Sequence, residues 1–165
     1  MTKDRNAQSE TANAYAESLA MSWRLDSGVG FLIRLLDARY HALYQRFNSD
    51  GSITPRQFGV LVTLHQKGAM SLTDLASAVQ ADRSTLGEMI TRMAQKRLVT
   101  KRNDGADRRS YEVTLAALGR RELLKRIESL QQLQAAILAP LPVDERADFL
   151  RCLRLVACAT DKDAI

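Results

Sequence analysis

Apolar residues recur every three or four positions along most of this chain, the spacing that places them on one face of an α-helix. Such series occupy residues 13–24, 29–47, 55–67, 116–138 and 143–159. The clearest one, in residues 29–47, predicts a buried stripe made of Val29, Leu32, Ile33, Leu36, Tyr40, Leu43, Tyr44 and Phe47. The pattern therefore predicts a mainly α-helical chain.

Capping residues mark where several of these helices begin. Thr54 followed by Pro55 suits an N-cap and a first helical position, where the missing N–H of proline costs nothing. Ser71 is placed to cap a short helix over 72–79, and Asp82 to cap the next helix. Two helices joined by three or four residues indicate a helix-turn-helix, although the turn between these two has no glycine.

The pattern changes after the second of these helices, where two short strand-like segments replace the helical spacing. Residues 98–102 and 110–115 are predicted strands, and the segment between them is rich in charged and turn-forming residues. A helix-turn-helix followed by a β-hairpin is a winged helix. The predicted fold is thus mainly α, with a winged helix-turn-helix at about 54–115 whose wing is a small β-hairpin.

The remaining helices suggest how the chain is organised. Residues 1–27 form an N-terminal extension, and residues 28–165 form the main domain. Helices at about 28–47, 116–138 and 143–159 supply more apolar length than one small winged helix can cover. They could fold back on their own domain, but we expect them to form a helical dimerisation region and hence a homodimer.

Positive charge is concentrated in one part of the chain. The whole chain has a formal net charge of +5, from 24 basic and 19 acidic residues. Residues 83–109 contain eight basic and three acidic residues, so their excess equals that of the entire protein. Such a concentration on one helix and loop is expected of a phosphate-binding surface, and the alternative is an ordinary solvated face.

Other functional classes find little support in the composition. No apolar run approaches the ~20 residues that span a bilayer, and residues 1–10 have no signal-peptide core, so no membrane association and a cytoplasmic location are expected. Two cysteines and two histidines do not supply a metal site, and no cofactor is expected. Without a catalytic triad or a glycine-rich phosphate loop, we expect no enzymatic activity. The two cysteines are Cys152 and Cys158, and the two histidines are His41 and His65.

The segment Asp107-Arg-Arg109-Ser-Tyr-Glu-Val113-Thr-Leu115, followed by Gly119, resembles the wing signature of the MarR family of winged-helix regulators. Ala116 stands where the signature has threonine, which should weaken the cap of the following helix. The resemblance covers roughly residues 28–158. It implies a homodimer that binds a pseudo-palindromic operator in double-stranded DNA.

The predicted recognition helix provides candidate contacts to the DNA. A helix in the major groove presents its N-terminal residues to base edges. Side chains farther along the helix and on the first strand are better placed for phosphates, which position a protein without specifying sequence. The base-contact candidates are Arg83, Ser84, Thr85 and Glu88, although Ser84 and Thr85 could instead only cap the helix. The phosphate candidates are Arg92, Lys96, Lys101 and Arg102.

The wing provides a second set of candidates. By the family resemblance, Arg109 enters the minor groove, where A·T-rich DNA is narrow and electronegative. Asp107, two residues earlier, can hold its guanidinium outward, and Arg108 is a phosphate candidate. The alternative is a surface ion pair of little energetic consequence.

A narrower resemblance suggests a ligand. Residues 29–34 and 54–58 are similar to segments of MarR-type repressors of aromatic-acid catabolism, including nicotinate degradation. In that family, ligands lie between the dimerisation helices and the DNA-binding lobe. Phe31, Arg34 and His41 share one helix face and could frame a small aromatic carboxylate, with its ring stacked and its acid paired. The alternative is a solvated helix face.

Taken together, the sequence predicts a homodimeric, sequence-specific transcriptional repressor that a small aromatic acid, with hydroxylated nicotinates as first candidates, releases from DNA. The alternative is a winged-helix protein-interaction module that does not bind DNA, which the concentration of charge disfavours. Redox sensing is a lesser alternative. The family's peroxide-sensing cysteines lie near the start of the chain, whereas both cysteines here lie near the end.

Overall fold

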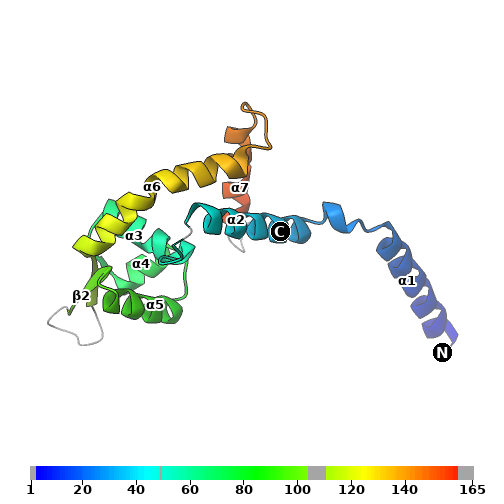
Figure 1. The fold of residues 1–165 in the computed structure, drawn as a ribbon. Coiled ribbons are helices and arrows are strands. Elements are labelled where there is room, and N and C mark those ends of the chain that lie inside the picture. The colour runs from blue at the N-terminus through cyan, green and yellow to red at the C-terminus, as the bar shows by residue number, and fades with distance from the viewer. Residues whose placement is uncertain (1–2, 49, 104–110, 160–165) are drawn as a thin grey trace. The chain divides into compact units, whose positions relative to one another are not determined.

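The computed structural model describes residues 3–48, 50–103 and 111–159, and these residues are mainly helical, as predicted (Figure 1). The chain divides into two compact units, residues 1–41 and 42–165. This division lies inside one helix, whereas the sequence placed the start of the main domain at residue 28. The elements in order are α1 (Lys3–Ser22), a 3-10 turn (Leu25–Ser27), α2 (Val29–Phe47), α3 (Pro55–Lys67), β1 (Met70–Ser71), α4 (Leu72–Ala78), α5 (Arg83–Gln95), β2 (Val99–Asn103), β3 (Tyr111–Leu115), α6 (Ala117–Leu138) and α7 (Arg146–Ala157).

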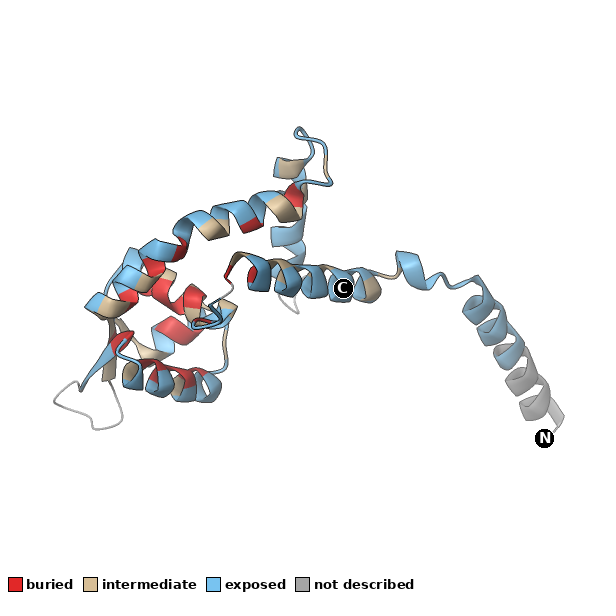
Figure 2. Cartoon of the chain, in the orientation of Figure 1, coloured by how far each residue is buried: buried red, intermediate tan, exposed pale blue. Residues whose placement is uncertain are grey.

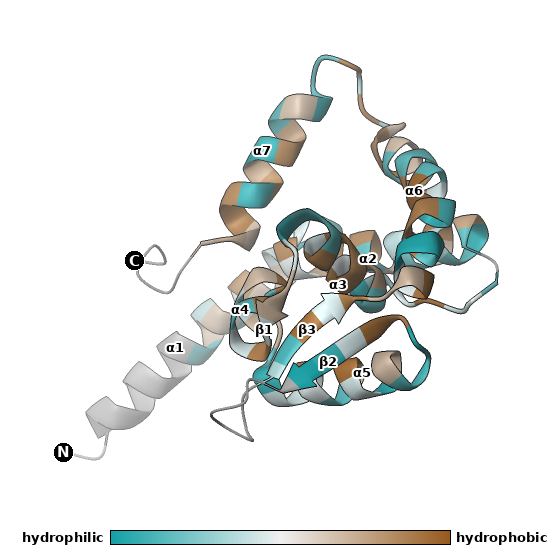
Figure 3. Ribbon diagram, turned by 90° about the vertical axis from the view of Figure 1, so that its left-hand side faces the viewer, coloured by the Kyte–Doolittle hydropathy of each residue, from teal (hydrophilic) through white to brown (hydrophobic). Residues whose placement is uncertain are grey.

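The wing strands belong to a three-stranded antiparallel sheet in the order β1-β3-β2 (Figure 3). Strands β2 and β3 pair from Val99 opposite Leu115 to Asn103 opposite Tyr111. On the other edge of β3, β1 pairs Met70 with Val113. The sequence predicted only the hairpin, because a strand of two residues is too short to show a period of its own.

The core of the second unit lies among α3, α4, α5 and the sheet (Figure 2). Each helix turns its apolar face inward, and burying one such leucine or isoleucine side chain stabilises the fold by about 1.5–3 kcal/mol. Start and end signals agree with the sequence: Thr54 and Gln57 form a capping box on α3, and Gly68 ends that helix. The fully buried large side chains are Val60, Leu61, Leu64, Leu75, Leu86, Ile90, Met93, Val99 and Val113.

Three sequence expectations about the other helices need correction. The apolar stripe of α2 exists, but within one chain only Tyr44 of it is buried, and Val29 is 69% exposed. On α6, Leu123 is buried in the core and Leu130 packs against it, so part of the apolar series in residues 116–138 is covered by its own chain. Helix α1 begins ten residues earlier than predicted, because its first half has helix-forming residues but no apolar period.

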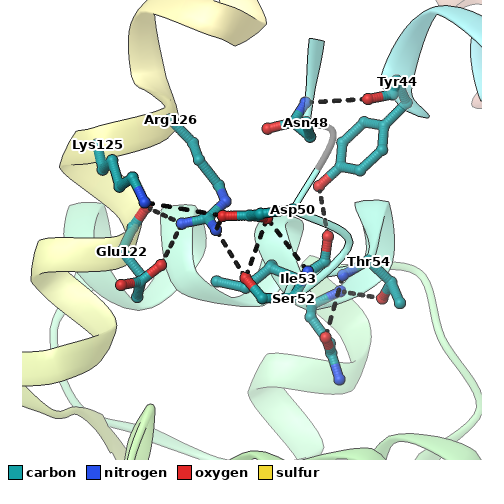
Figure 4. Close-up of polar contacts among 10 residues, drawn as sticks. Tyr44, Asn48, Asp50, Ser52, Ile53, Thr54, Glu122, Lys125 and Arg126 are labelled. Carbon is teal, nitrogen blue, oxygen red and sulfur yellow. Dashed lines mark hydrogen bonds and ion pairs between the residues drawn. The ribbon is translucent and has the colours of Figure 1, made fainter. Parts of the chain in front are cut away.

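A buried arginine fixes the loop between α2 and α3 (Figure 4). Arg126 of α6 is 3% exposed and forms ion pairs with Asp50 and Glu122. Its guanidinium also donates to Ser52 Oγ at 2.7 Å. A buried guanidinium without these partners would cost several kcal/mol, so the network ties the loop to α6. The loop in turn leads into the cap of α3, and thus the network positions the helix-turn-helix.

This network should make stability depend on pH. The hydrogen bond that Asp50 accepts from Arg126 lowers the pKa of the Asp50 carboxyl from 3.8 to about 2. A lowered carboxyl pKa gives stability that is present above the unfolded-state value and is lost as the pH falls toward the folded-state value. Asp50→Asn should therefore be less stable than wild type in denaturant unfolding at pH 7, and the gap should narrow as the pH falls from about 5 toward about 3.

An exposed ion pair provides the control for this prediction. Asp148 and Arg151 lie 3.2 Å apart on α7, and both side chains are well exposed. Asp148→Asn should therefore change stability little at either pH. A stability gap for Asp50→Asn that stays constant across the pH range would contradict the role of the Asp50 carboxylate.

Candidate nucleic-acid interface

The N-terminus of α5 is well capped and stands at an exposed position. Asp82 accepts a hydrogen bond from the backbone N–H of Thr85 at 2.9 Å. This bond lowers the pKa of the Asp82 carboxyl, which therefore stays ionised next to the positive end of the helix dipole. The preceding turn needs a residue with positive φ, which is often glycine, and here Gln80 adopts it with a φ of 50°. The sequence prediction of the cap is confirmed.

The two faces of α5 differ sharply in burial. Leu86, Met89, Ile90 and Met93 face the core. The opposite face is exposed and consists of polar and charged side chains. All five of the helix residues predicted to contact DNA lie on this exposed face, namely Arg83, Ser84, Thr85, Glu88 and Arg92.

The two basic residues of β2 lie on opposite faces of the hairpin, because successive side chains of a strand alternate. Arg102 is 3.6 Å from Glu112 on the neighbouring strand, and its side chain is 84% exposed. Lys101 instead reaches α5, where its ammonium donates to Thr91 Oγ1 at 2.8 Å. The sequence treated these two cations as equivalent, but their environments differ.

Lys96 lies at the C-cap of α5, far along the helix from the base-contact candidates. It lines an open cavity of about 410 Å³ together with Asp50, Glu122 and Lys125. Two of these neighbours are acidic and already pair with Arg126. Lys96 thus stands beside the Arg126 network rather than beside the base-contact candidates.

The predicted minor-groove residues of the wing lie outside the described residues. Asp107, Arg108 and Arg109 belong to the segment 104–110, which the structure does not describe. The strands on either side are described, and their pairing ends with Asn103 opposite Tyr111. The assignment of this segment to the minor groove stays a prediction.

The candidate ligand face belongs to the first unit. The Arg34 guanidinium lies 5.0 Å from the centroid of the Phe31 ring, so the structure brings these two predicted residues together. His41 is not joined to them by any contact described here. It lies 3.6 Å from Asp37 and meets the ring of Tyr40 edge-on at 5.5 Å. Burial raises the pKa of the Tyr40 phenol. The sequence assigned Tyr40 to the apolar stripe and therefore did not predict its contact with His41.

The described part of the chain has neither a membrane-spanning helix nor a cluster of metal-binding side chains. None of its helices is long and apolar enough to cross a membrane. No group of three or more histidine, cysteine or acidic side chains is arranged there to hold a metal ion. Cys152 and Cys158 are both exposed, and each is a free thiol.

Comparisons with known proteins agree on one family. Residues 53–111 match the model of the MarR family. The chain is 30% identical over 126 residues to the HTH-type transcriptional repressor NicR of Pseudomonas putida, covering 76% of this chain and 80% of NicR. It is 28% identical over 122 residues to the Escherichia coli transcriptional regulator HosA, covering 74% of this chain and 89% of HosA.

Solved structures give the same result. BpsR of Bordetella bronchiseptica, described in terms of regulation of its DNA binding by 6-hydroxynicotinic acid, superposes with a TM-score of 0.78 at 30% identity. That match covers 84% of this chain and 99% of BpsR. The PcaV transcriptional regulator of Streptomyces coelicolor, solved with its natural ligand, gives a TM-score of 0.76 at 28% identity, covering 84% of this chain and 97% of PcaV.

Proposed function

Because this chain belongs to the MarR family of transcriptional regulators, we propose that it is a homodimeric repressor that binds a specific operator and leaves it when a small aromatic acid binds. Members of this family are DNA-binding regulators rather than enzymes. The observation that carries the proposal is the exposed, capped and cationic face of α5, whose opposite face is anchored in the core.

The DNA-binding part of the proposal assigns roles by position. Arg83, Ser84, Thr85 and Glu88 occupy the first turns of α5, where a helix in the major groove meets base edges. Arg92 and Arg102 are exposed and lie farther from the helix start, so we assign them to phosphates. Arg109 is the minor-groove candidate on the strength of its sequence signature alone.

The dimer is supported by apolar surface that one chain leaves uncovered. Helix α7 has no buried residue, and its Leu155 and Val156 are 63% and 68% exposed. Large apolar side chains are also exposed on α2, at Val29, Leu32 and Ile33, and on α6, at Leu124 and Ile127. Monomeric proteins seldom expose that many large apolar side chains on three helices, whereas homodimer interfaces bury them.

One experiment tests binding to a specific operator and dimerisation. The purified chain is mixed with fragments of its own genome, and the fragments that it retains are sequenced. We expect enrichment of a short pseudo-palindrome, and light scattering of the free protein should report twice the mass of one chain. Retention of no sequence above background would favour the protein-interaction alternative.

The effector part of the proposal predicts the phenotype of Arg34→Ala. The relatives BpsR and PcaV are described with 6-hydroxynicotinic acid and with a natural ligand, respectively. Arg34 stacks on Phe31, and in this proposal it pairs with the carboxylate while the ring of the acid packs nearby. Arg34→Ala should keep operator binding but lose release by aromatic acids, with ligand affinity in calorimetry falling by about 10-fold or more.

Arg46→Ala provides the matched control for this variant. Arg46 lies on the same helix and stacks on Phe47 at 5.9 Å, near the other end of α2. It should respond to the acid like wild type. Equal ligand affinity in the two variants would show that Arg34 is not the carboxylate partner.

A further inference from the structure

Lys101 is the point where the recognition helix and the wing hairpin meet. Its register partner on β3 is the buried Val113, so the lysine leaves β2 on the side of the sheet that faces the core. Its ammonium donates to Thr91 Oγ1 on α5 at 2.8 Å. The same ammonium lies 4.6 Å from the centroid of the Tyr111 ring on β3. One side chain of β2 thus contacts both α5 and β3, and we call Thr91, Lys101 and Tyr111 the Lys101 cluster.

The two partners of Lys101 both lie close to Gly87 of α5. The Thr91 hydroxyl donates to the carbonyl of Gly87 at 2.9 Å, which leaves its oxygen lone pairs free to accept from the ammonium. The Tyr111 hydroxyl lies close to the same glycine, because a Cβ placed on Gly87 would be 3.9 Å from the hydroxyl oxygen. Burial raises the pKa of the Tyr111 phenol, and the nearby charge of Arg83 acts in the opposite direction. The cluster therefore lies beside a residue that we assign to base contact.

We infer that Lys101 is a positioning residue, which holds the wing hairpin and the recognition helix at the angle that lets both contact the same operator. This inference rests on the proposed DNA-binding function. Because a hairpin is anchored at its base, a small rotation of the strands there displaces the far end of the hairpin by a larger distance. Bridging α5 to both strands limits that rotation before DNA binds, and such preorganisation lowers the ordering cost of the complex.

A direct phosphate contact by Lys101 predicts different behaviour, which a double-mutant cycle separates. The variants are Thr91→Val, Lys101→Gln and the double variant. The probes are a duplex selected by the wild-type chain and a scrambled duplex of the same length. Thr91→Val changes no charge, and Thr63→Val is its matched control because Thr63 donates to the carbonyl of Gly59 at 2.9 Å in the same way on α3.

The positioning role predicts a specific pattern. Thr91→Val should weaken binding to the selected duplex about fivefold to tenfold, with little change for the scrambled duplex and an unchanged salt slope. Adding Thr91→Val to Lys101→Gln should weaken binding no further, because both changes break one contact. Thr63→Val should bind like wild type, and all variants should keep a wild-type circular dichroism spectrum.

Two results would overturn the inference. If Thr91→Val binds both duplexes like wild type while Lys101→Gln weakens both equally and lowers the salt slope, Lys101 is an ordinary phosphate contact. If Thr91→Val weakens both duplexes in proportion to a loss of folded protein, its role is structural. Failure of the proposed function is distinct, because then the wild-type chain itself would not separate the selected duplex from the scrambled one, and the inference would fall with it.

Discussion

Gly119→Ala should lower the free energy of unfolding by roughly 3–5 kcal/mol, which is a large fraction of the roughly 5–15 kcal/mol that stabilises a typical domain. Gly119 lies in the first turn of α6 and is buried against the chain segment before β2. A Cβ there would be 2.0 Å from the carbonyl oxygen of Leu98 and 2.9 Å from its carbonyl carbon. The same carbonyl accepts the backbone N–H of Ala116 at 3.1 Å, so it cannot move aside without losing this bond.

Gly87→Ala is the matched control, because Gly87 is also a glycine inside a helix. A Cβ at that position would stand 3.5 Å from a methyl group of Leu72, which is an ordinary contact. Alanine is the better helix former, so this variant should be more stable by about 0.5–1 kcal/mol. Thermal unfolding of both variants makes the comparison. Equal melting temperatures for Gly119→Ala and wild type would mean that α6 does not approach Leu98 as closely as described.

Raising salt from about 50 to about 200 mM should weaken operator binding by about 10³-fold or more. A dimer that neutralises roughly six to ten phosphates releases as many counterions, and each contributes to the slope of log affinity against log salt. The excess of five positive charges in residues 83–109 is equal to the net charge of the chain. Fluorescence anisotropy with the selected duplex measures this slope.

A pair of arginine variants checks where the salt dependence originates. Arg92→Gln removes an exposed cation of α5, and should lower the slope by about one for each protomer that contacts DNA. Arg151→Gln removes an exposed cation of α7, which pairs with Asp148, and should leave the slope unchanged. An affinity that stays flat across the salt range would count against DNA binding altogether and favour the protein-interaction alternative.

Local signals made the helix starts predictable. The caps Thr54, Ser71 and Asp82 each form the backbone hydrogen bond expected of them. The period of apolar residues gave α2 with the bounds that the structure has, and the two short strand-like segments on either side of the charged turn located β2 and β3 within a residue. These features depend on neighbours a few positions apart, so sequence spacing is enough to show them.

Contacts between distant segments explain what was missed. Arg126 was not singled out by the sequence, because its partners Asp50 and Ser52 lie more than seventy positions earlier in the chain. Lys101 and Arg102 are neighbours in sequence, but only Lys101 contacts α5, across ten positions. Gly119 is part of the wing signature in the sequence, but only the structure shows that the Leu98 carbonyl leaves no room for a side chain at this position.

The sequence by itself determined the order of the elements, the capped recognition helix, the concentration of positive charge and, through the wing signature, the MarR family. All of these are written in residue types and short-range spacing. Only the tertiary structure decided which apolar residues are covered by their own chain, which cations have partners, and that β1 completes the sheet. Those outcomes depend on long-range packing, in which burial and pairing are set by segments that fold together from far apart along the chain.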